Sequence, residues 1–377
     1  MRIRINKISA SICEHPLDDK FVIVSNIGVH RRSRFVLVEI QSSDEITGYG
    51  EGATTAIWSG ETAETAKSIV ENIFAPNLEN QYFDHPGEVS SIVNELAVGN
   101  PFAKAAVDTA FWDLWARTQC SRVSDLVADR RPIESIPTRA SIGVYNIQQT
   151  VSIATAFWEA GIRVLKFKVG VPPHDDVARL KAVREELGDD PVFTIDPNGG
   201  YSSRDIAVAA IEALLPFNLK FVEQPTPRDR IQMLADVRRR IPVPIIADES
   251  IFTKGHLYEA LDCDAFDILS VYPGKNGGFT SCLDMVETAK KYGKACVLGS
   301  NLETDLGQAA MANLAAGLEA FPVEEIAGDL GSCMYYKDSS VTNPLALSNG
   351  RINVPEGIGF GVSPITSEGN LKLKNIC

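Results

Sequence analysis

Two hydrophobic patterns divide the chain near residue 130. In the first part, alternating apolar and polar residues predict a meander of β-strands over 2–52 that ends in the glycine-rich segment TGYGEG. Apolar residues at helical spacing then predict helices at about 60–75, 86–97 and 101–119. Asn100 can serve as the N-cap of the last of these, and Pro101 fits its first turn. Strands followed by helices predict an α+β domain over 1–130.

From about residue 136, short apolar runs alternate with amphipathic stretches. Strands are expected at 137–144, 164–170, 192–197, 219–224, 244–249, 266–272, 295–300 and 324–329. Their near-constant spacing matches the length that a parallel strand, its loop and its return helix need. We therefore expect an α/β fold whose main part, residues 131–342, is a TIM-like (β/α)₇₋₈ barrel rather than an open sheet. The polar, glycine-rich tail, 343–377, is expected to return to the first domain.

Three acidic residues end three successive apolar runs: Asp196 in VFTIDPNGG, Glu223 in LKFVEQP and Asp248 in PIIADES. Equivalent strand ends would bring them to one rim of the barrel, where barrel enzymes place their catalytic groups. A single acid at such a place is more often a helix cap or a turn residue, but three in succession favour a metal site. Oxygen ligands suit Mg²⁺ or Mn²⁺ better than zinc. We therefore predict that these three residues bind Mg²⁺ (or Mn²⁺).

A pair of lysines, Lys166 and Lys168, ends the apolar run VLKFKVG. Side chains alternate along a strand, so both lysines face the same side, as do Asp196 and Asn198. A purely structural alternative is that the lysines only pair with carboxylates. In the functional interpretation, each ammonium group lowers the pKa of the other and so produces an amine base near neutral pH. We predict Lys168, nearer the strand end, as the base and Lys166 as the group that tunes it.

Composition and charge exclude several classes of function. With 45% hydrophobic and 23% charged residues, the chain has the composition of a soluble globular protein. A net charge of −13 argues against nucleic-acid binding, and no apolar run approaches the length of a membrane span. Seven cysteines without a metal-like cluster favour buried free thiols, with disulfides as the alternative. We expect a cytoplasmic enzyme that acts on a small molecule and has no nucleic-acid or membrane partner.

The motifs KFK, TIDPN, FVEQP, ADES and KNGG together resemble the enolase superfamily, specifically its muconate lactonizing enzyme subgroup, over essentially the whole chain. The resemblance implies that the first domain caps the barrel and is completed by the C-terminal tail. It also implies a carboxylate substrate that binds the metal ion and loses its α-proton to a base, which produces an enediolate. We further expect a homo-oligomer.

The segment GEGATTAIWSGETAET resembles the mobile lid of muconate and chloromuconate cycloisomerases, which implies that Ile57 and Trp58 are pocket residues. Packing between domains is the alternative for Trp58. After the seventh strand, Glu303 aligns with an acidic position of relatives and is a candidate proton relay, with an N-cap as the alternative. Asn301 is a candidate to hydrogen-bond the substrate, as is Asn198.

Three further polar residues receive no catalytic role from the sequence. Asp329 is interpreted as a turn former, Glu249 as a side chain that faces away from Asp248, and His30 as a solvent-facing histidine.

The sequence departs from the family pattern at the sixth strand. The subgroup usually has a second catalytic lysine five residues before a Gly-Gly pair, and here Tyr272 occupies that position in SVYPGKNGG. Either Tyr272 replaces the lysine, or Pro273 and Gly274 reshape the loop so that Lys275 reaches the site. We favour Tyr272 facing the site, with Lys275 near the rim. The departure puts two-base racemase chemistry in doubt.

These observations predict an isomerase or lyase that abstracts the α-proton of a carboxylate substrate, with muconate-type cycloisomerisation as the main interpretation. The alternatives within the superfamily are racemisation or epimerisation of an N-acyl amino acid or dipeptide, and dehydration of a hydroxy acid. A catalytically inactive binding protein would have lost a metal ligand, and the sequence has lost none.

Overall fold

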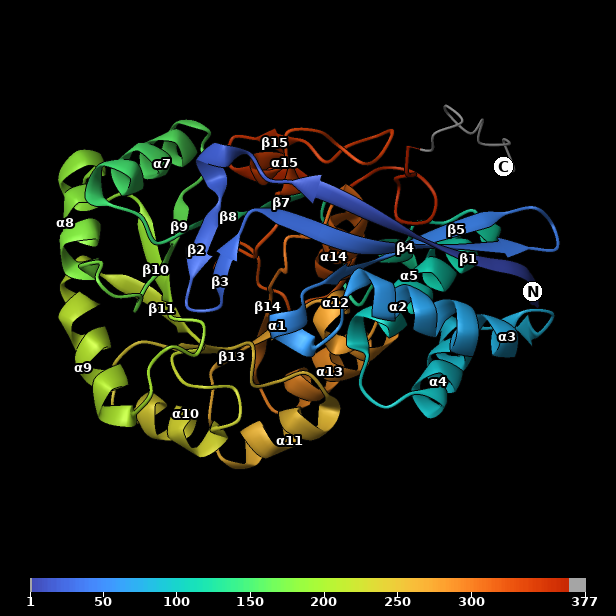
Figure 1. The fold of residues 1–377 in the computed structure, drawn as a ribbon, viewed down its shortest axis with the longest axis horizontal. Helices are drawn as coiled ribbons and strands as arrows, with labels where there is room; N and C mark the ends of the chain where they lie inside the picture. The colour runs from blue at the N-terminus through green and yellow to red at the C-terminus, as the bar shows by residue number, and fades with distance from the viewer. Residues whose placement is uncertain (1, 366–377) are drawn as a thin grey trace.

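A computed structural model describes residues 2–365 and shows an antiparallel sheet with its helices beside a curled parallel sheet (Figure 1). The antiparallel sheet has the strand order β5-β4-β1-β6. Its strands are β1 (Ile3–Pro16), β4 (Arg32–Ser42), β5 (Thr47–Thr54) and β6 (Tyr82–Phe83). The helices that follow are α1 (Ala56–Ser59), α2 (Ala63–Ile69), a π-helical turn (Val70–Phe74), α3 (Ala75–Leu78), α4 (Pro86–Leu96), α5 (Pro101–Thr118) and α6 (Val123–Leu126). The predicted meander and helices are confirmed.

The alternating glycines of TGYGEG allow α5 to pack closely on β5. A Cβ atom added at Gly48, Gly50 or Gly52 would lie 2.3, 2.1 or 2.5 Å from a carbonyl oxygen of α5. No side chain larger than hydrogen fits such a contact. The helix is buried on almost every side, because it lies between this sheet and the helices of the parallel sheet.

Asn100 occupies the N-cap position of α5 and Pro101 its first turn, as predicted, but the Asn100 side chain does not cap the helix. Its backbone is left-handed, with φ of 54°, and its side chain makes no capping hydrogen bond. The carboxylate of Glu61 accepts hydrogen bonds from the N–H groups of Phe102 and Ala103 instead, at 3.1 and 2.9 Å. A distant carboxylate thus satisfies the free N–H groups of the helix end.

The parallel sheet has the strand order β8-β9-β10-β11-β12-β13-β14. Its strands are β8 (Arg139–Ile142), β9 (Val164–Lys168), β10 (Val192–Asp196), β11 (Leu219–Glu223), β12 (Ile245–Ala247), β13 (Ile268–Val271) and β14 (Ala295–Leu298). The helices around it are α7 (Ile147–Glu159), α8 (Asp176–Leu187), α9 (Arg204–Leu214), α10 (Ile231–Arg238), α11 (Lys254–Asp262), α12 (Pro273–Asn276), α13 (Phe279–Lys291) and α14 (Asp305–Gly317). Short 3₁₀ turns occur at Asp19–Phe21 and Leu215–Phe217. The helices form an arc around the strands (Figure 1).

The eighth expected strand, 324–329, is not assigned as a strand within the described residues. Its end nevertheless reaches both edges of the parallel sheet. Arg139 N donates to Gly328 O at 3.1 Å, and Asp329 N donates to Leu298 O at 2.9 Å. Together with the bonds of Thr138 to Gly328 and Leu330, these contacts place Asp329 between β14 and β8. The helix that follows, α15 (Ser332–Tyr335), is only four residues long.

The chain after α15 turns back toward the first sheet and its helices. Strands β15 (Leu347–Ser348) and β16 (Arg351–Asn353) form a small sheet with β7 (Ser135–Pro137). Further along, Arg117 of α5 donates to Val362 O at 2.9 Å. The described part of the tail thus contacts α5, and the rest of the tail, 366–377, lies outside the described residues.

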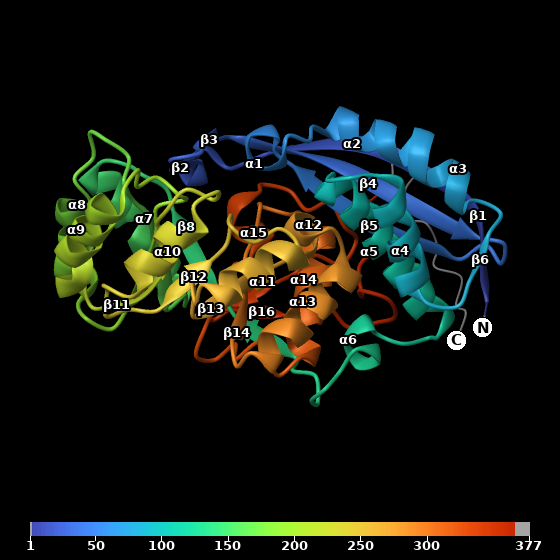
Figure 2. The ribbon, with the colours of Figure 1, turned by 90° about the horizontal axis from the view of Figure 1, so that it is seen from below.

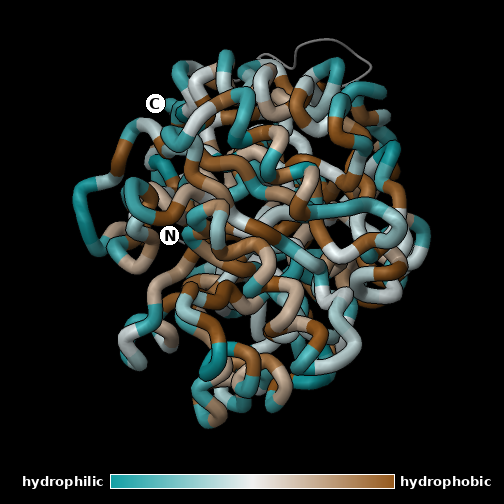
Figure 3. The backbone as a smooth tube through the Cα atoms, turned by 90° about the vertical axis from the view of Figure 1, so that its left-hand side faces the viewer, coloured by the Kyte–Doolittle hydropathy of each residue, from teal (hydrophilic) through white to brown (hydrophobic). Residues whose placement is uncertain are grey.

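A hairpin formed by β2 (Ile23–Ser25) and β3 (Gly28–His30) extends over the parallel sheet, as does α1 (Figures 1 and 2). Asn26 in its turn donates hydrogen bonds to Val169 O and Pro197 O, at 2.9 and 2.7 Å. These carbonyls follow β9 and β10 directly, so Asn26 fixes the hairpin to two adjacent strand ends. Hydrophilic segments lie along much of the outline of the molecule (Figure 3). No helix in residues 2–365 is long and apolar enough to cross a membrane.

Candidate active site

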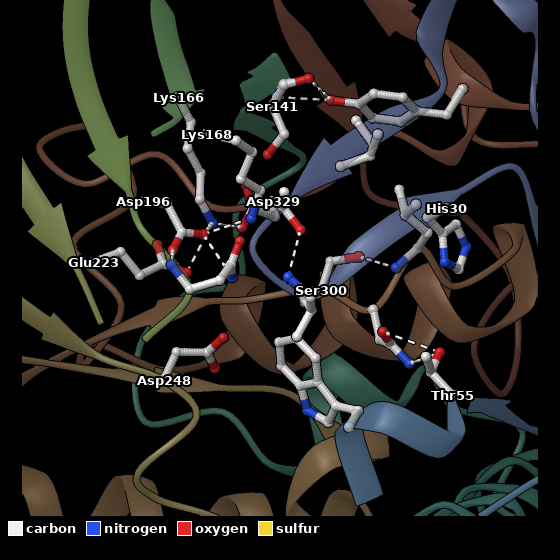
Figure 4. Close-up of a pocket in the computed structure, with 18 of the residues that line it drawn as sticks. His30, Thr55, Ser141, Lys166, Lys168, Asp196, Glu223, Asp248, Ser300 and Asp329 are labelled. Carbon is white, nitrogen blue, oxygen red and sulfur yellow. Dashed lines mark hydrogen bonds and ion pairs between the residues drawn. The ribbon is translucent and has the colours of Figure 1, made fainter. Parts of the chain in front are cut away.

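A cavity of about 190 Å³ lies at the carboxyl ends of the parallel strands, beneath the hairpin and α1. Its inner end includes seven charged residues on the parallel strands or directly beyond them: Arg139, Lys166, Lys168, Asp196, Glu223, Asp248 and Asp329. Its outer wall consists of residues from the hairpin and the loops: Ile23, Ser25, Ile27, Val29, His30, Thr55, Ile57, Trp58, Ser300, Asn301, Leu302 and Leu330. The charged groups gather on one side of the cavity, with His30 and Thr55 on the other (Figure 4).

The cavity brings together nine of the residues predicted from the sequence. They are Lys166, Lys168, Asp196, Asn198, Glu223, Asp248, Ile57, Trp58 and Asn301. Tyr272, Lys275 and Glu303 do not belong to its lining.

The two lysines of β9 have different surroundings. Lys168 Nζ makes one ion pair, with Asp196 Oδ2 at 2.6 Å. Lys166 Nζ makes three, with Glu223 Oε1 at 2.7 Å, Asp329 Oδ2 at 3.0 Å and Asp196 Oδ2 at 3.1 Å. Lys168 is therefore the less constrained amine of the pair.

The expected lowering of the lysine pKa is wrong for Lys166 in this arrangement. Burial and the neighbouring Arg139 act to lower the pKa of Lys166, but Asp329, Glu223 and Asp196 raise it above its ordinary value. The same contact has the opposite effect on the acid. Burial acts to raise the pKa of Asp196, but Lys168 and Lys166 lower it.

Arg139 and Asp329 belong to the site although the sequence analysis did not select them. Arg139 Nη2 lies 2.7 Å from Glu223 Oε2, and its Nε lies 2.8 Å from Asp329 Oδ1. Asp329 is thus a member of a buried ion-pair network and not merely a turn former. Burial acts to raise the pKa of Asp329, but Arg139 and Lys166 lower it. The available signal was an arginine inside an apolar strand, which requires a buried acidic partner.

Lys275 is fully buried rather than near the rim. Its Nζ donates to Asp248 Oδ1 at 2.8 Å, to Asp248 O at 3.0 Å and to Ser270 O at 2.7 Å. These three bonds use the three N–H donors of an ammonium group. Tyr272 is also fully buried and does not line the cavity, contrary to the expectation that it faces the site, and its hydroxyl has no hydrogen-bond partner among residues 2–365. Burial, followed by the charge of Asp248, raises the pKa of Tyr272 well above its ordinary value.

Asn198 connects Asp196 to Glu249. Its backbone N donates to Asp196 Oδ1 at 2.8 Å, and its Nδ2 donates to Glu249 Oε1 at 2.8 Å. Glu249 is outside the cavity lining, in agreement with the sequence interpretation. Burial, followed by the charges of Asp248 and Asp196, raises the pKa of Glu249 well above its ordinary value.

Polar contacts hold the lid segment around α1. Asn301 Nδ2 donates to Ala53 O at 2.6 Å and to Thr55 Oγ1 at 3.0 Å. Glu303 accepts from Ser300 Oγ at 2.6 Å, and burial raises its pKa to about 7. Thr304, not Glu303, is the N-cap of α14. Trp58 is buried, with 5% of its surface exposed, whereas Ile57 is 60% exposed.

We expected His30 to face solvent, but the structure places it in the outer wall of the cavity. Its Nε2 is 2.6 Å from Ser33 Oγ. Burial lowers the pKa of His30 to about 4, so the imidazole is neutral at neutral pH. The hairpin turns His30 toward the cavity. The residues next to His30 in the sequence give no sign of this orientation.

The donor set of the inner end fits a hard divalent cation. Asp196, Glu223 and Asp248 are buried, line one cavity and offer only oxygen atoms. Each is paired with an ammonium or guanidinium group, and among residues 2–365 no three acidic, histidine or cysteine side chains stand in an arrangement that could hold a metal ion. A bound cation would therefore have to draw these carboxylates away from their present partners.

Comparisons with known proteins agree with this site. The model for "Enolase C-terminal domain-like" matches residues 149–367, and that for "Mandelate racemase / muconate lactonizing enzyme, N-terminal domain" matches residues 7–128. Muconate cycloisomerase 1 of Rhodococcus opacus is 29% identical over 87% of both chains. N-succinylamino acid racemase of an Amycolatopsis species is 29% identical over 84% of both chains.

A solved structure of dipeptide epimerase from Enterococcus faecalis V583, complexed with Mg and the dipeptide L-Leu-L-Tyr, has a TM-score of 0.88 and 25% identity, covering 96% of this chain and 99% of that one. The first family model alone covers more than half of the chain, and these relatives are all enzymes. The chain therefore belongs to the enolase superfamily, among the enzymes related to muconate lactonizing enzyme.

Proposed function

We propose that the protein removes the α-proton of a carboxylate substrate with Mg²⁺ bound, and that it completes an addition or elimination from the same face of the enediolate. Muconate-type cycloisomerisation is the main candidate within this class of reaction, and a muconate cycloisomerase is among the relatives. Mn²⁺ is the alternative ion, and Mg²⁺ is preferred because a dipeptide epimerase of this fold is complexed with Mg.

One observation carries the proposal: both lysines of the cavity lining come from a single strand, β9. Inversion at the α-carbon needs a second proton-transfer group on the opposite face. Lys275 has its three donors occupied, and Tyr272, with a raised pKa, is a poor base at neutral pH. The geometry therefore supports chemistry on one face better than racemisation.

The residues have the following proposed roles. Lys168 is the base, and Lys166 tunes it while joining Asp329 to Glu223 and Asp196. Asp196, Glu223 and Asp248 would hold the metal ion, which when bound would stabilise the developing negative charge of the substrate. Asn198 orients Asp196. Tyr272 stays the candidate hydrogen-bond or proton donor to the leaving group, a role that requires it to reach the cavity, which it does not line in this structure. Ile57, Trp58, Asn301 and Glu303 position or support the lid.

The remaining sequence expectations are also proposals. They are a closed (β/α)₇₋₈ barrel over 131–342, a capping domain over 1–130 completed by the tail 343–377, assembly as a homo-oligomer and a cytoplasmic location. The contacts of Gly328 and Asp329 with both edge strands support closure of the barrel.

Two alternatives remain within the superfamily. Racemisation or epimerisation of an N-acyl amino acid or dipeptide would need Tyr272 or Lys275 as a second base, and a racemase is among the relatives. Dehydration of a hydroxy acid, like cycloisomerisation, needs a base on only one face.

Deuterium exchange tests the proposal directly. A panel of chiral carboxylates, including N-acyl amino acids, is incubated with the Mg²⁺-loaded protein in D₂O and followed by NMR and chiral chromatography. We expect exchange at the α-carbon with retention of configuration, and Tyr272→Phe should slow turnover without stopping exchange. Rapid deuterium incorporation with inversion, from either enantiomer, would overturn the proposal in favour of the epimerase alternative.

A further inference from the structure

The outer wall of the cavity contains no group with a fixed charge among the described residues. Its apolar members are Ile23, Ile27, Val29, Ile57, Trp58, Leu302 and Leu330, and its polar members are serine, threonine, asparagine and histidine. His30 is its one titratable member. Its Nε2 is engaged with Ser33, and burial keeps its pKa near 4, so this ring provides no positive charge at neutral pH.

The cations of the inner end already have acidic partners. Three cationic groups, Arg139, Lys166 and Lys168, line it with four acidic groups, Asp196, Glu223, Asp248 and Asp329, and each cation makes at least one ion pair at 3.1 Å or less. Lys275, which lies behind the lining, pairs with Asp248 at 2.8 Å. The side chains leave no unpaired positive charge for an anionic ligand. The only additional positive charge would come from a bound divalent ion.

The unpaired atoms of the lining are neutral as well. Among the described lining residues, the buried side-chain atoms without a hydrogen-bond partner are Trp58 Nε1 and Asn198 Oδ1. The first is a neutral donor in the outer wall, and the second is a neutral acceptor beside Asp196. A ligand can therefore gain a hydrogen bond from this lining, but it gains no counter-ion at the outer wall.

From these contacts we infer that the substrate carries a single carboxylate, bound at the inner end, and that the rest of it is uncharged and mainly apolar. The inference rests on the one-faced α-proton chemistry of the proposed function. It moves the preference within that chemistry from muconate-type cycloisomerisation to the loss of a neutral group, as in dehydration. A second ionised group would meet only neutral side chains at the outer wall, and the loss of part of its hydration without a charged partner is costly.

Substrates of this family differ in whether they carry a second charged group, and the cavity should discriminate between them. A dicarboxylate such as muconate, or a zwitterionic dipeptide, would place its second charge against the outer wall. One-faced reactions in which the leaving or ring-closing group is neutral, such as a hydroxyl, remain compatible with the cavity. We therefore expect muconate itself to be a poor ligand.

Three unreactive acids of equal chain length provide the test. Hexanoate, adipate and 6-aminohexanoate end in a methyl, a carboxylate and an ammonium group, respectively. The Mg²⁺-loaded protein is titrated with each acid in a calorimeter at neutral pH. We expect hexanoate to bind about tenfold or more tightly than either charged probe, a difference of about 1.4 kcal/mol or more.

Variants of the outer wall reverse the preference if the inference is right. His30→Arg should raise the affinity for adipate relative to hexanoate about tenfold. The matched control His30→Gln, which is neutral, should leave the ratio unchanged. Val29→Arg supplies the same charge at a position that is 55% exposed, so it tests the idea even if His30→Arg fails to fold.

Three results would overturn the inference: adipate or 6-aminohexanoate binding as tightly as hexanoate, no detectable binding of hexanoate at millimolar concentration, or no gain for adipate in either folded arginine variant. Failure of the proposed function has a different signature. In that case hexanoate would still bind preferentially, but no chiral carboxylate would exchange its α-proton with retention.

Discussion

At the inner end of the cavity, charged side chains come from neighbouring strands of the parallel sheet or from the residues that follow them. Ion pairs of 2.6 to 3.1 Å connect these side chains. At the outer wall, neutral side chains come from a hairpin and loops that belong to other parts of the chain. Sheet register fixes the first region, as the pairing of Asp196 with Lys168 shows. A few hydrogen bonds, such as those of Asn26 and Asn301, fix the second.

This difference indicates a division of labour. The rigid inner end provides the proton transfer and the cation ligands, which require accurate placement. The outer wall decides what else of the substrate can enter, and it can change without disturbing the strands. Substitutions in the two regions should therefore have different effects, and the following predictions test this.

The largest effect is expected for Lys168→Ala. A general base contributes about 10² to 10⁴ in rate, so turnover should fall by at least this factor. Asp196 keeps Lys166 as a partner at 3.1 Å, so the melting temperature should change little. Steady-state kinetics and thermal unfolding measure both quantities. Turnover close to that of the wild type would mean that another residue is the base.

Lys166→Met should instead reduce stability. It removes a buried cation that contacts Glu223, Asp329 and Asp196. Breaking a buried ion pair on one side costs about 3–5 kcal/mol, because a charge remains without a partner. Denaturant unfolding should show this loss in the Met variant. An equal loss for Lys168→Met would contradict the distinction between the two lysines.

A moderate effect is expected at the outer wall for Asn26→Ala. The variant loses two hydrogen bonds that fix the hairpin to the strand ends, each worth about 1 kcal/mol. KM should rise about tenfold, with a smaller change in kcat. Asn77→Ala, which removes a similar hydrogen bond from an exposed helix, serves as the control and should leave both constants unchanged. A loss confined to kcat would show that the hairpin does more than hold the substrate.

The smallest effect on turnover is expected for Glu51, which lies outside the cavity, where β5 contacts Thr304 at the start of α14. Burial raises the pKa of Glu51 to about 8. Between pH 4.5 and about 8, Glu51 is protonated in the native state but ionised in the unfolded state. The stability of the protein should therefore fall as pH rises through this range. The free energy of unfolding of Glu51→Gln should therefore increase relative to that of the wild type over this range, by at most ~1.4 kcal/mol per pH unit. Thermal unfolding between pH 5 and 9 measures it, with the exposed Glu95→Gln as control. A difference that does not vary with pH would contradict the raised pKa.

The inner end was largely predictable from the sequence because its residues follow a period. Glu223 was expected at the end of a strand over 219–224 and ends β11, and Asp196 likewise ends β10. The spacing of parallel strand ends is a local property of the chain, so it can be read without knowledge of distant contacts.

Other parts of the site depend on contacts between distant segments. Arg139 and Asp329 are 190 residues apart, and only closure of the sheet edges brings them together. His30 faces the cavity because Asn26 fixes the hairpin across 143 and 171 residues of sequence. Lys275 was placed near the rim, but the short helix α12 directs its side chain to Asp248. Periodicity and spacing carry no information about such pairings.

Titration of the protein with Mg²⁺ tests the central claim most directly, because the inner end must exchange its lysine and arginine partners for a divalent ion. We expect calorimetry to show one Mg²⁺ per chain, and Glu223→Gln to abolish this binding while the fold is retained. Glu324→Gln, an exposed acid paired with Arg351, is the matched control and should bind Mg²⁺ as the wild type does. No Mg²⁺ binding by the wild type, or undiminished binding by Glu223→Gln, would contradict the account.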